Sequence, residues 1–124
     1  MGSRETGRMG ERYAVRLLEE KGYRVLERNF HSRYGEIDLI ISDGQYICFV
    51  EVKTRRQGSM VGGFTAVTIS KQRKIIATAL LYLQRNPSDL QPRFDVLSIL
   101  VGKPGGVLSH DYLTGAFDCE AYYR

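Results

Sequence analysis

The stretch GEIDLIISDGQYICFVEVKTR, residues 35–55, decides the fold. Gly35–Ile41 and Gln45–Thr54 are rich in β-branched and aromatic residues, and the sequence Ser42-Asp43-Gly44 between them is a turn signal. This pattern predicts a β-hairpin. Because side chains alternate across a strand, we expect one face of the hairpin to be apolar, with Ile37, Leu39 and Ile41 on it, and the other to carry Asp38, Glu51 and Lys53.

These three charges lie inside otherwise apolar strands, where charged side chains are seldom buried unless they are paired or bound to a metal. Carboxylates suit Mg²⁺, which usually takes one or two of them and keeps waters and substrate phosphate as its other ligands. Lys53 would point into the same site and could orient or deprotonate a water, or offset the charge of a phosphate. The alternative is an edge-strand salt bridge that discourages aggregation.

Asp38, followed after twelve residues by Glu51-Val52-Lys53, resembles the metal-binding signature of the PD-(D/E)XK nuclease superfamily. The runs GERYAVRLLEEKGYRVLERNF and GEIDLI…FVEVKTR are similar to the YraN-type family of small bacterial proteins, which is related to archaeal Holliday-junction resolvases. The similarity extends from Gly7 to Phe117. It implies a site that holds Mg²⁺ (or Mn²⁺) through the side chains of Glu11, Asp38 and Glu51 and the main-chain carbonyl near Val52, with Glu36 as a supporting group.

Residues 5–21 have apolar residues at helical spacing, and Gly22 ends the predicted helix. Glu11 lies at the border of the apolar stripe and would look toward the sheet. From the residues alone, Glu11 could equally be a first-turn acid that complements the helix dipole. The resemblance favours its place in the metal site.

The rest of the chain adds strands at Tyr23–Phe30 and Arg93–Val101, a weak final strand at Leu108–Tyr112, and a helix that Thr68 or Ser70 caps and that ends before Pro87. The order α-β-β-β-α-β(-β) predicts a mixed sheet flanked by helices, as in restriction-endonuclease-like proteins. The second helix allows a crossover that makes the fourth strand parallel to the third. Its buried stripe is expected to comprise Ile75, Ile76, Ala79, Leu80 and Leu83.

Two basic segments are candidate nucleic-acid contacts. Lys71, Arg73 and Lys74 lie in the first turn of the second helix, where cations oppose the helix dipole and no anion is near in sequence. Three cations beside unpaired N–H groups would form a phosphate site, or the turn could simply be solvated. Arg55 and Arg56 begin a basic, glycine-rich loop to Gly63 that could order on substrate or merely connect two elements.

Composition sets the limits of these interpretations. With 124 residues, 43% hydrophobic and 26% charged, the chain is expected to form a single domain over residues 1–124. The net charge of +4 favours a polyanionic partner. Two cysteines and two histidines without paired spacing predict neither a disulfide framework nor a zinc site. The lack of a long apolar run or a signal-peptide core argues against a membrane and for a cytoplasmic protein.

The combined expectation is a Mg²⁺-dependent endonuclease that hydrolyses DNA, including branched DNA. One alternative is a nucleic-acid-binding module that keeps the fold without turnover. The other is an RNA nuclease, which the lack of an obvious aromatic stacking platform in the sequence disfavours. The resemblance also favours a homodimer, since cutting two strands needs two sites.

Overall fold

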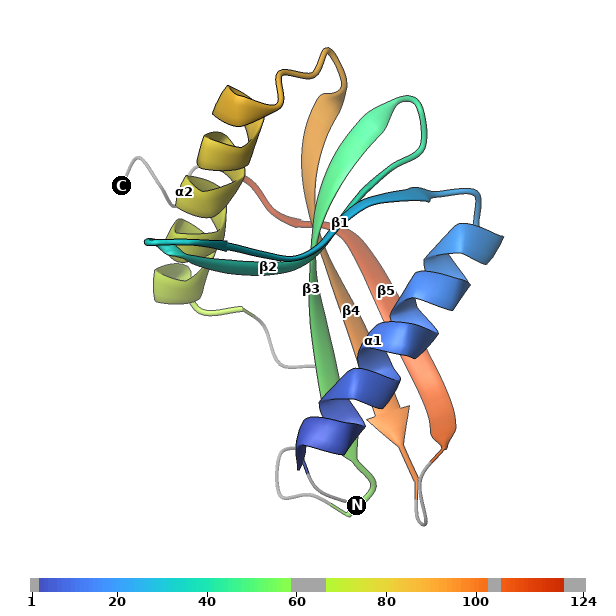
Figure 1. Cartoon of the computed structure of the whole chain (residues 1–124). Coiled ribbons are helices and arrows are strands. Elements are labelled where there is room, and N and C mark those ends of the chain that lie inside the picture. Colours follow the sequence, from blue (N-terminus) through green and yellow to red (C-terminus); the bar gives the residue numbers. More distant parts are fainter. Residues whose placement is uncertain (1–2, 59–66, 103–105, 120–124) are drawn as a thin grey trace.

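The structure is a computed structural model that describes residues 3–58, 67–102 and 106–119 (Figure 1). Two helices and five strands follow the predicted order α-β-β-β-α-β-β, which confirms the fold class. The elements are α1 (Ser3–Glu20), β1 (Arg24–Ser32), β2 (Gly35–Ser42), β3 (Tyr46–Arg56), α2 (Ile69–Arg85), β4 (Gln91–Val101) and β5 (Val107–Phe117).

The strands form a single mixed sheet in the order β1-β2-β3-β4-β5. Neighbouring strands are antiparallel except β3 and β4, which run parallel from the pair Tyr46–Gln91 to the pair Arg56–Val101. The helix α2 makes the crossover between these two strands, as its position in the sequence predicts. The β2–β3 turn is held by the Asp43 carboxylate, which accepts hydrogen bonds from the backbone N–H groups of Gln45 and Tyr46.

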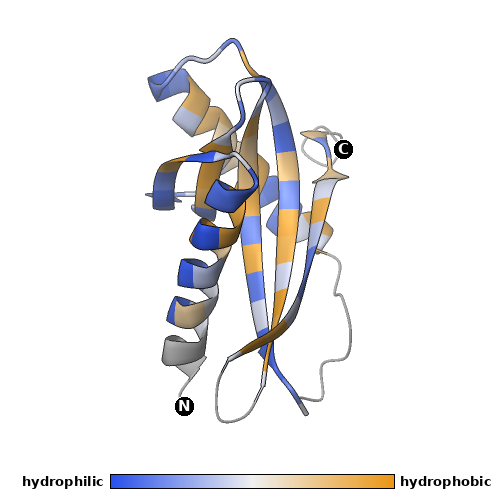
Figure 2. Ribbon diagram, turned by 90° about the vertical axis from the view of Figure 1, so that its right-hand side faces the viewer, coloured by the Kyte–Doolittle hydropathy of each residue, from blue (hydrophilic) through white to orange (hydrophobic). Residues whose placement is uncertain are grey.

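The helices α1 and α2 cover opposite faces of the sheet, and each encloses a separate apolar cluster (Figure 1). Figure 2 shows hydrophobic and hydrophilic residues alternating along the strands in its foreground. Ala14 and Leu18 of α1 pack on one face, and Ile75, Ile76 and Ala79 of α2 pack on the other. The central strands are therefore buried on both faces, as parallel and mixed sheets between helices are.

Three details differ from the sequence-based expectations. Leu80 is exposed rather than part of the buried stripe of α2, and Tyr82 is buried in its place because it lies on the face of the helix that meets the sheet. The final strand is longer than Leu108–Tyr112, since pairing with β4 extends it over Val107–Phe117. Arg55 and Arg56, which were expected to begin a loop, are the last two residues of the strand β3. The remainder of that expected loop, residues 59–63, lies outside the described residues.

A buried ionic network joins β4 to β5 and to the turn after α1. The carboxylate of Asp95 is fully buried and accepts two hydrogen bonds from Arg93, one from the Tyr112 hydroxyl and one from the Gly115 N–H. Arg93 also donates to the hydroxyl of Tyr23. The buried carboxylate therefore has hydrogen-bond donors for both of its oxygens, and the network ties segments far apart in sequence into one arrangement.

In the described part of the chain, no helix has the length and apolarity needed to cross a membrane.

The contact between α1 and β3 depends on Gly10. A Cβ atom at Gly10 would lie 2.1 Å from Oγ1 of Thr54, closer than two such atoms can approach. Gly10 is itself buried, so the missing side chain lets the helix backbone approach the strand directly. This close approach sets the height of α1 above the sheet and the position of the residue that follows, Glu11.

We predict that Gly10→Ala lowers the free energy of unfolding by about 1–3 kcal/mol, because the methyl group overpacks the contact with Thr54. Gly7→Ala is the matched control on the same helix: nothing lies within 4 Å of its Cβ position, so it should stabilise by about 0.5–1 kcal/mol. Urea unfolding of both variants measures the difference. If both variants were stabilised, α1 would not be held against β3 in this way.

Candidate functional site

The candidate site lies where β2 leaves β3. The β2–β3 ladder runs from Ser42–Ile47 to Leu39–Val50 and ends there. In the same register the next hydrogen-bonded pair would be Ile37 with Val52, which would exchange two backbone hydrogen bonds. Instead, Oδ2 of Asp38 accepts the hydrogen bond of the Val52 N–H at 2.7 Å. A side-chain carboxylate thus replaces a strand backbone and occupies the gap between the two strands.

The backbone of β1 is irregular at the same level. Asn29 lies opposite Asp38, between the pairs Arg28–Leu39 and Phe30–Ile37, and has a φ of 52°. Asparagine is one of the few residues that tolerate this left-handed conformation. Beyond this point the ends of β1 and β2 turn away from β3 and run toward α2 (Figure 1).

This bend corrects the expected alternation of the hairpin. Ile37 was predicted to share a face with Leu39 and Ile41, but it packs with Ile40 in the cluster under α2. The hairpin also has no single apolar face: Ile40 and Phe49, on the side of the charges, are as deeply buried as Leu39. The bend at this level, where Asn29 of the paired strand has a left-handed conformation, accounts for the change of face, which a strict alternation rule ignores.

Asp38 is an unusual acid. Its pKa is raised to about 7, chiefly by burial and next by the neighbouring carboxylate of Glu51, against the opposing effect of the hydrogen bond from the Val52 N–H. The charges of Glu11 and Glu36 act in the same direction. A carboxyl group with a pKa this high lies among negative charges with too little positive charge to balance them.

Glu51 continues this negative patch and has a cation beside it. Burial raises the pKa of Glu51, and the Lys71 ammonium opposes that rise. Nζ of Lys71 is 3.5 Å from Oε1 of Glu51, and the two side chains are 46% and 13% exposed. The first turn of α2 therefore lies beside the Glu51 carboxylate.

Lys53 and Val52 complete the arrangement on β3. Lys53 is partly buried and lies two residues after Glu51, on the same face, where its charge lowers the pKa of Glu51. The carbonyl of Val52 points to the same side of the strand as its N–H, into the gap beside Asp38. By alternation Arg55 also shares the face of Glu51 and Lys53, whereas Arg56 is on the other face.

The predicted ligands converge only in part. Glu11 and Glu36 are near enough for their charges to act on Asp38, and Glu36 also contacts His31 at 3.2 Å. However, among the residues that the structure describes, no three acidic, histidine or cysteine side chains are grouped closely enough to hold a metal ion. Asp38 and Glu51 are the pair that the fold brings together, and Glu11 approaches from the opposite layer.

Lys71 is the residue whose partner the sequence did not reveal. No anion lies near the basic turn of α2 in the sequence, but the structure supplies one in Glu51, twenty residues earlier. No acidic residue lies in the first turn of α2, so the only sign of this ion pair in the sequence was the unbalanced positive charge of that turn. The turn is fixed by Thr68, whose hydroxyl accepts a hydrogen bond from the Lys71 N–H at 3.1 Å.

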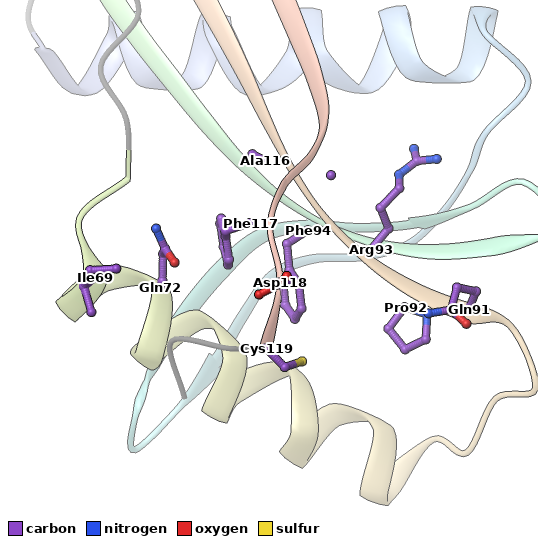
Figure 3. Close-up of a pocket in the computed structure, with 11 residues that line it drawn as sticks. Ile69, Gln72, Gln91, Pro92, Arg93, Phe94, Ala116, Phe117, Asp118 and Cys119 are labelled. Carbon is purple, nitrogen blue, oxygen red and sulfur yellow. The ribbon is translucent and has the colours of Figure 1, made fainter. Parts of the chain in front are cut away.

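A pocket of about 750 Å³ opens on another side of the same helical turn (Figure 3). Ile69 and Gln72 of α2 line it together with the start of β4 and the end of β5, including the stacked rings of Phe94 and Phe117. None of the site's carboxylates lines this pocket. The pocket is therefore separate from the candidate site beside Asp38.

The raised pKa of Asp38 makes stability depend on pH. The folded protein holds a proton up to about pH 7 that the unfolded chain releases near the ordinary aspartate value of 3.8. The stability that this proton contributes is present in full below pH 3.8 and is lost as the pH rises through 7. Asp38→Asn removes the titration and keeps an oxygen that can accept the Val52 hydrogen bond.

We therefore predict that, in a chelator, Asp38→Asn is more stable than the wild type by about 2–4 kcal/mol at pH 8, because the folded wild type must ionise a buried carboxyl. The difference should shrink steadily toward pH 4. Urea unfolding of both proteins across this range is the measurement. A constant difference would mean that Asp38 titrates normally.

Comparison with known proteins places this chain in a family. The model of the uncharacterised protein family UPF0102 matches residues 10–99, from Gly10 at the α1–β3 contact to near the end of β4. A UPF0102 protein of Chlorobium chlorochromatii is 45% identical over 97 residues, which cover 78% of this chain and 75% of that protein. One from Dictyoglomus thermophilum is 37% identical over 118 residues, which cover 94% of this chain and 100% of that protein. The chain belongs to the uncharacterised protein family UPF0102, the family that the YraN-type resemblance indicated.

Proposed function

We propose that the protein is a metal-dependent nuclease that hydrolyses phosphodiester bonds in DNA, with Asp38, Glu51 and Lys53 at its centre. The observation that carries the proposal is the pairing of two partly buried carboxylates in the gap beside Val52, where burial and the neighbouring negative charge of Glu51 together raise the pKa of Asp38 to about 7. Concentrated, desolvated negative charge of this kind is typical of sites that bind a divalent cation or do acid–base chemistry.

The donor set fits Mg²⁺ or Mn²⁺. These ions take one or two carboxylates and complete an octahedron with waters and substrate phosphate, so Asp38, Glu51 and the carbonyl of Val52 are enough protein ligands. Glu11 would join them only if α1 or its side chain shifted toward the gap. When bound, the ion would lower the pKa of a water and polarise the phosphate.

The chain's own residues would then have separate tasks. The hydrogen bond from Val52 fixes the orientation of the Asp38 carboxylate. Lys53, on the same face as Glu51, would donate hydrogen bonds to the attacking water or to a phosphate oxygen. Lys71 of the first turn of α2, and with it Arg73 and Lys74 of the next turn, would contact the substrate backbone beside the carboxylates. Arg55, on the same face of β3 as Glu51, would extend this contact along the strand, whereas Arg56 lies on the other face.

The decisive experiment is a cleavage assay with duplex, flap, four-way-junction and single-stranded DNA and RNA, in Mg²⁺ or Mn²⁺. We predict that Asp38→Asn lowers the cleavage rate at least about a hundredfold, the scale of losing one electrostatic stabiliser in a catalytic site. Binding of DNA should remain, because the basic residues are untouched. Asp111→Asn, an exposed acid on β5, is the matched control and should cleave like the wild type.

Two results would count against the proposal. The first is wild-type protein that cleaves none of the substrates and binds no Mn²⁺ by calorimetry. The second is cleavage that survives in Asp38→Asn after purification in parallel with Asp111→Asn, since the activity would then belong to a contaminant or to another site. A preference for RNA substrates would correct the nucleic acid and leave the catalytic residues as proposed.

The ion pair of Lys71 with Glu51 gives a second prediction. The ammonium competes with a divalent cation for the Glu51 carboxylate, so Lys71→Gln should bind Mn²⁺ more tightly, by up to about fivefold, the equivalent of an exposed ion pair. The same change should weaken DNA binding and lower its salt slope by about one. Calorimetry and a salt titration measure the two effects.

Lys74→Gln is the control for this prediction, because it removes the same charge from the next turn of α2. It should weaken DNA binding similarly and leave Mn²⁺ affinity nearly unchanged. An equal gain in Mn²⁺ affinity in both variants would show that the general positive potential, and not the contact with Glu51, opposes the metal.

A further inference from the structure

The ends of β1 and β2 form a two-stranded arm beyond the rest of the sheet. The ladder between β2 and β3 ends at Leu39, but β1 and β2 stay paired from Phe30–Ile37 to Ser32–Gly35. We call residues 30–37 the arm. It begins directly after Asn29 and the bend that places Asp38 in the site, so the site and the arm have one structural origin.

The arm is fixed against α2. The rings of Phe30 and Tyr82 meet edge to face with centroids 5.1 Å apart, and Oγ of Ser32 is 2.9 Å from Oγ1 of the buried Thr78. Gly35 is so close to the helix that a Cβ would lie 3.3 Å from Cβ of Lys74. An isolated two-stranded hairpin is marginally stable in water, so these contacts are what hold the arm in one position beside the helix (Figure 1).

The tip of the arm carries an exposed aromatic ring with an arginine over it. The Tyr34 side chain is 42% exposed. Arg33 places its guanidinium carbon 4.9 Å from the ring centroid and donates a hydrogen bond of 2.7 Å to the Tyr34 hydroxyl. A solvent-facing tyrosine on a firmly held arm, next to a cation, is a stacking platform of the kind that binds bases in single strands.

Two lysines of α2, Lys74 and Lys71, lie between this tip and the carboxylates. Gly35 contacts Lys74, and Lys74 is one helical turn from Lys71, a spacing that puts the Cβ atoms of neighbours about 5–6 Å apart on one face. Lys71 in turn contacts Glu51. A phosphate backbone that followed these lysines from the site would bring its next nucleotides to the tip of the arm.

We propose that Tyr34, supported by Arg33, stacks on an unpaired base next to the phosphate held at the site, so that the substrates are DNA strands with unpaired nucleotides beside the cleaved bond. This inference rests on the proposed nuclease function and names its substrate class. In an uninterrupted duplex the bases are stacked inside and cannot reach an exposed ring without being extruded. Stacking on tyrosine is tolerant of sequence, because every base has a π-face.

The test is a binding measurement in a chelator, by fluorescence anisotropy, with three DNAs of equal length: a duplex with a short unpaired segment, the same DNA with abasic nucleotides in that segment, and a fully paired duplex. Tyr34→Ala should weaken binding to the first DNA about 5- to 100-fold, the range of one base–aromatic stack. It should change binding to the abasic and paired DNAs little. Tyr34→Phe keeps the ring and should bind all three like the wild type.

Leu113→Ala is the matched control, since it removes a similarly exposed side chain from β5 at the opposite edge of the sheet. Thermal unfolding of each variant checks that the fold is kept. Equal losses on the unpaired and abasic DNAs, or no loss in Tyr34→Ala, would overturn the inference and leave the nuclease proposal standing. Wild-type protein that binds none of the three DNAs would overturn both.

Discussion

The hydrogen bond from the Val52 N–H to the Asp38 carboxylate is the constraint on which the rest of the site depends. A strand that ends its pairing in the middle of a sheet leaves backbone groups without partners, and burying such groups is costly. Here a side chain takes the place of the missing strand, so β2 can leave β3 without losing that bond. The same departure opens the gap for the carboxylates, frees the ends of β1 and β2 to reach α2, and forces Asn29 into a left-handed conformation. The candidate site, the arm and the bend at Asn29 all follow from this one feature, in which the Asp38 side chain takes the place of a strand backbone beside Val52.

Two aspartates in the same sheet show how differently the fold treats one residue type. Asp95 is fully buried and receives hydrogen bonds from Arg93, Tyr112 and the Gly115 backbone, so its charge is compensated on all sides. Asp38 receives a single hydrogen bond from the described part of the chain, that of Val52, while the negative charge of Glu51 faces it. A compensated carboxylate stabilises an arrangement and has no capacity for a further ligand. An under-compensated one costs stability and keeps oxygens available, which is the expected signature of a binding or catalytic group.

The sequence predicted the fold well because its signals are local. The β-branched and aromatic runs of β2 and β3, the cap at Thr68 and the crossover length each depend on neighbouring residues, and the structure confirms the hairpin, the cap and the parallel pair of strands. Asp38 and Glu51 could be singled out because charges in apolar strands are conspicuous. The contact of Lys71 with Glu51 and the network of Asp95 could not be predicted, since both join segments that only the tertiary fold brings together. The change of face at Ile37 was missed for a related reason: strict alternation assumes a regular backbone.

The layers explain why the carboxylates lie where they do. Both faces of β3 are covered from Ile47 to Val50, so a charge in that part of the strand would be sealed between α1 and α2 without solvent. Past Val50 the strand β2 no longer pairs with β3, and α2 has only begun, so the carboxylates remain partly open while apolar residues surround them. Gly10 lets α1 approach β3 directly at Thr54, which brings Glu11 to the same gap from the other layer. Partial burial at this position raises the pKa of Asp38 and still leaves room for a ligand. A fully exposed carboxylate would keep its ordinary pKa, and a fully covered one could not be reached by a ligand.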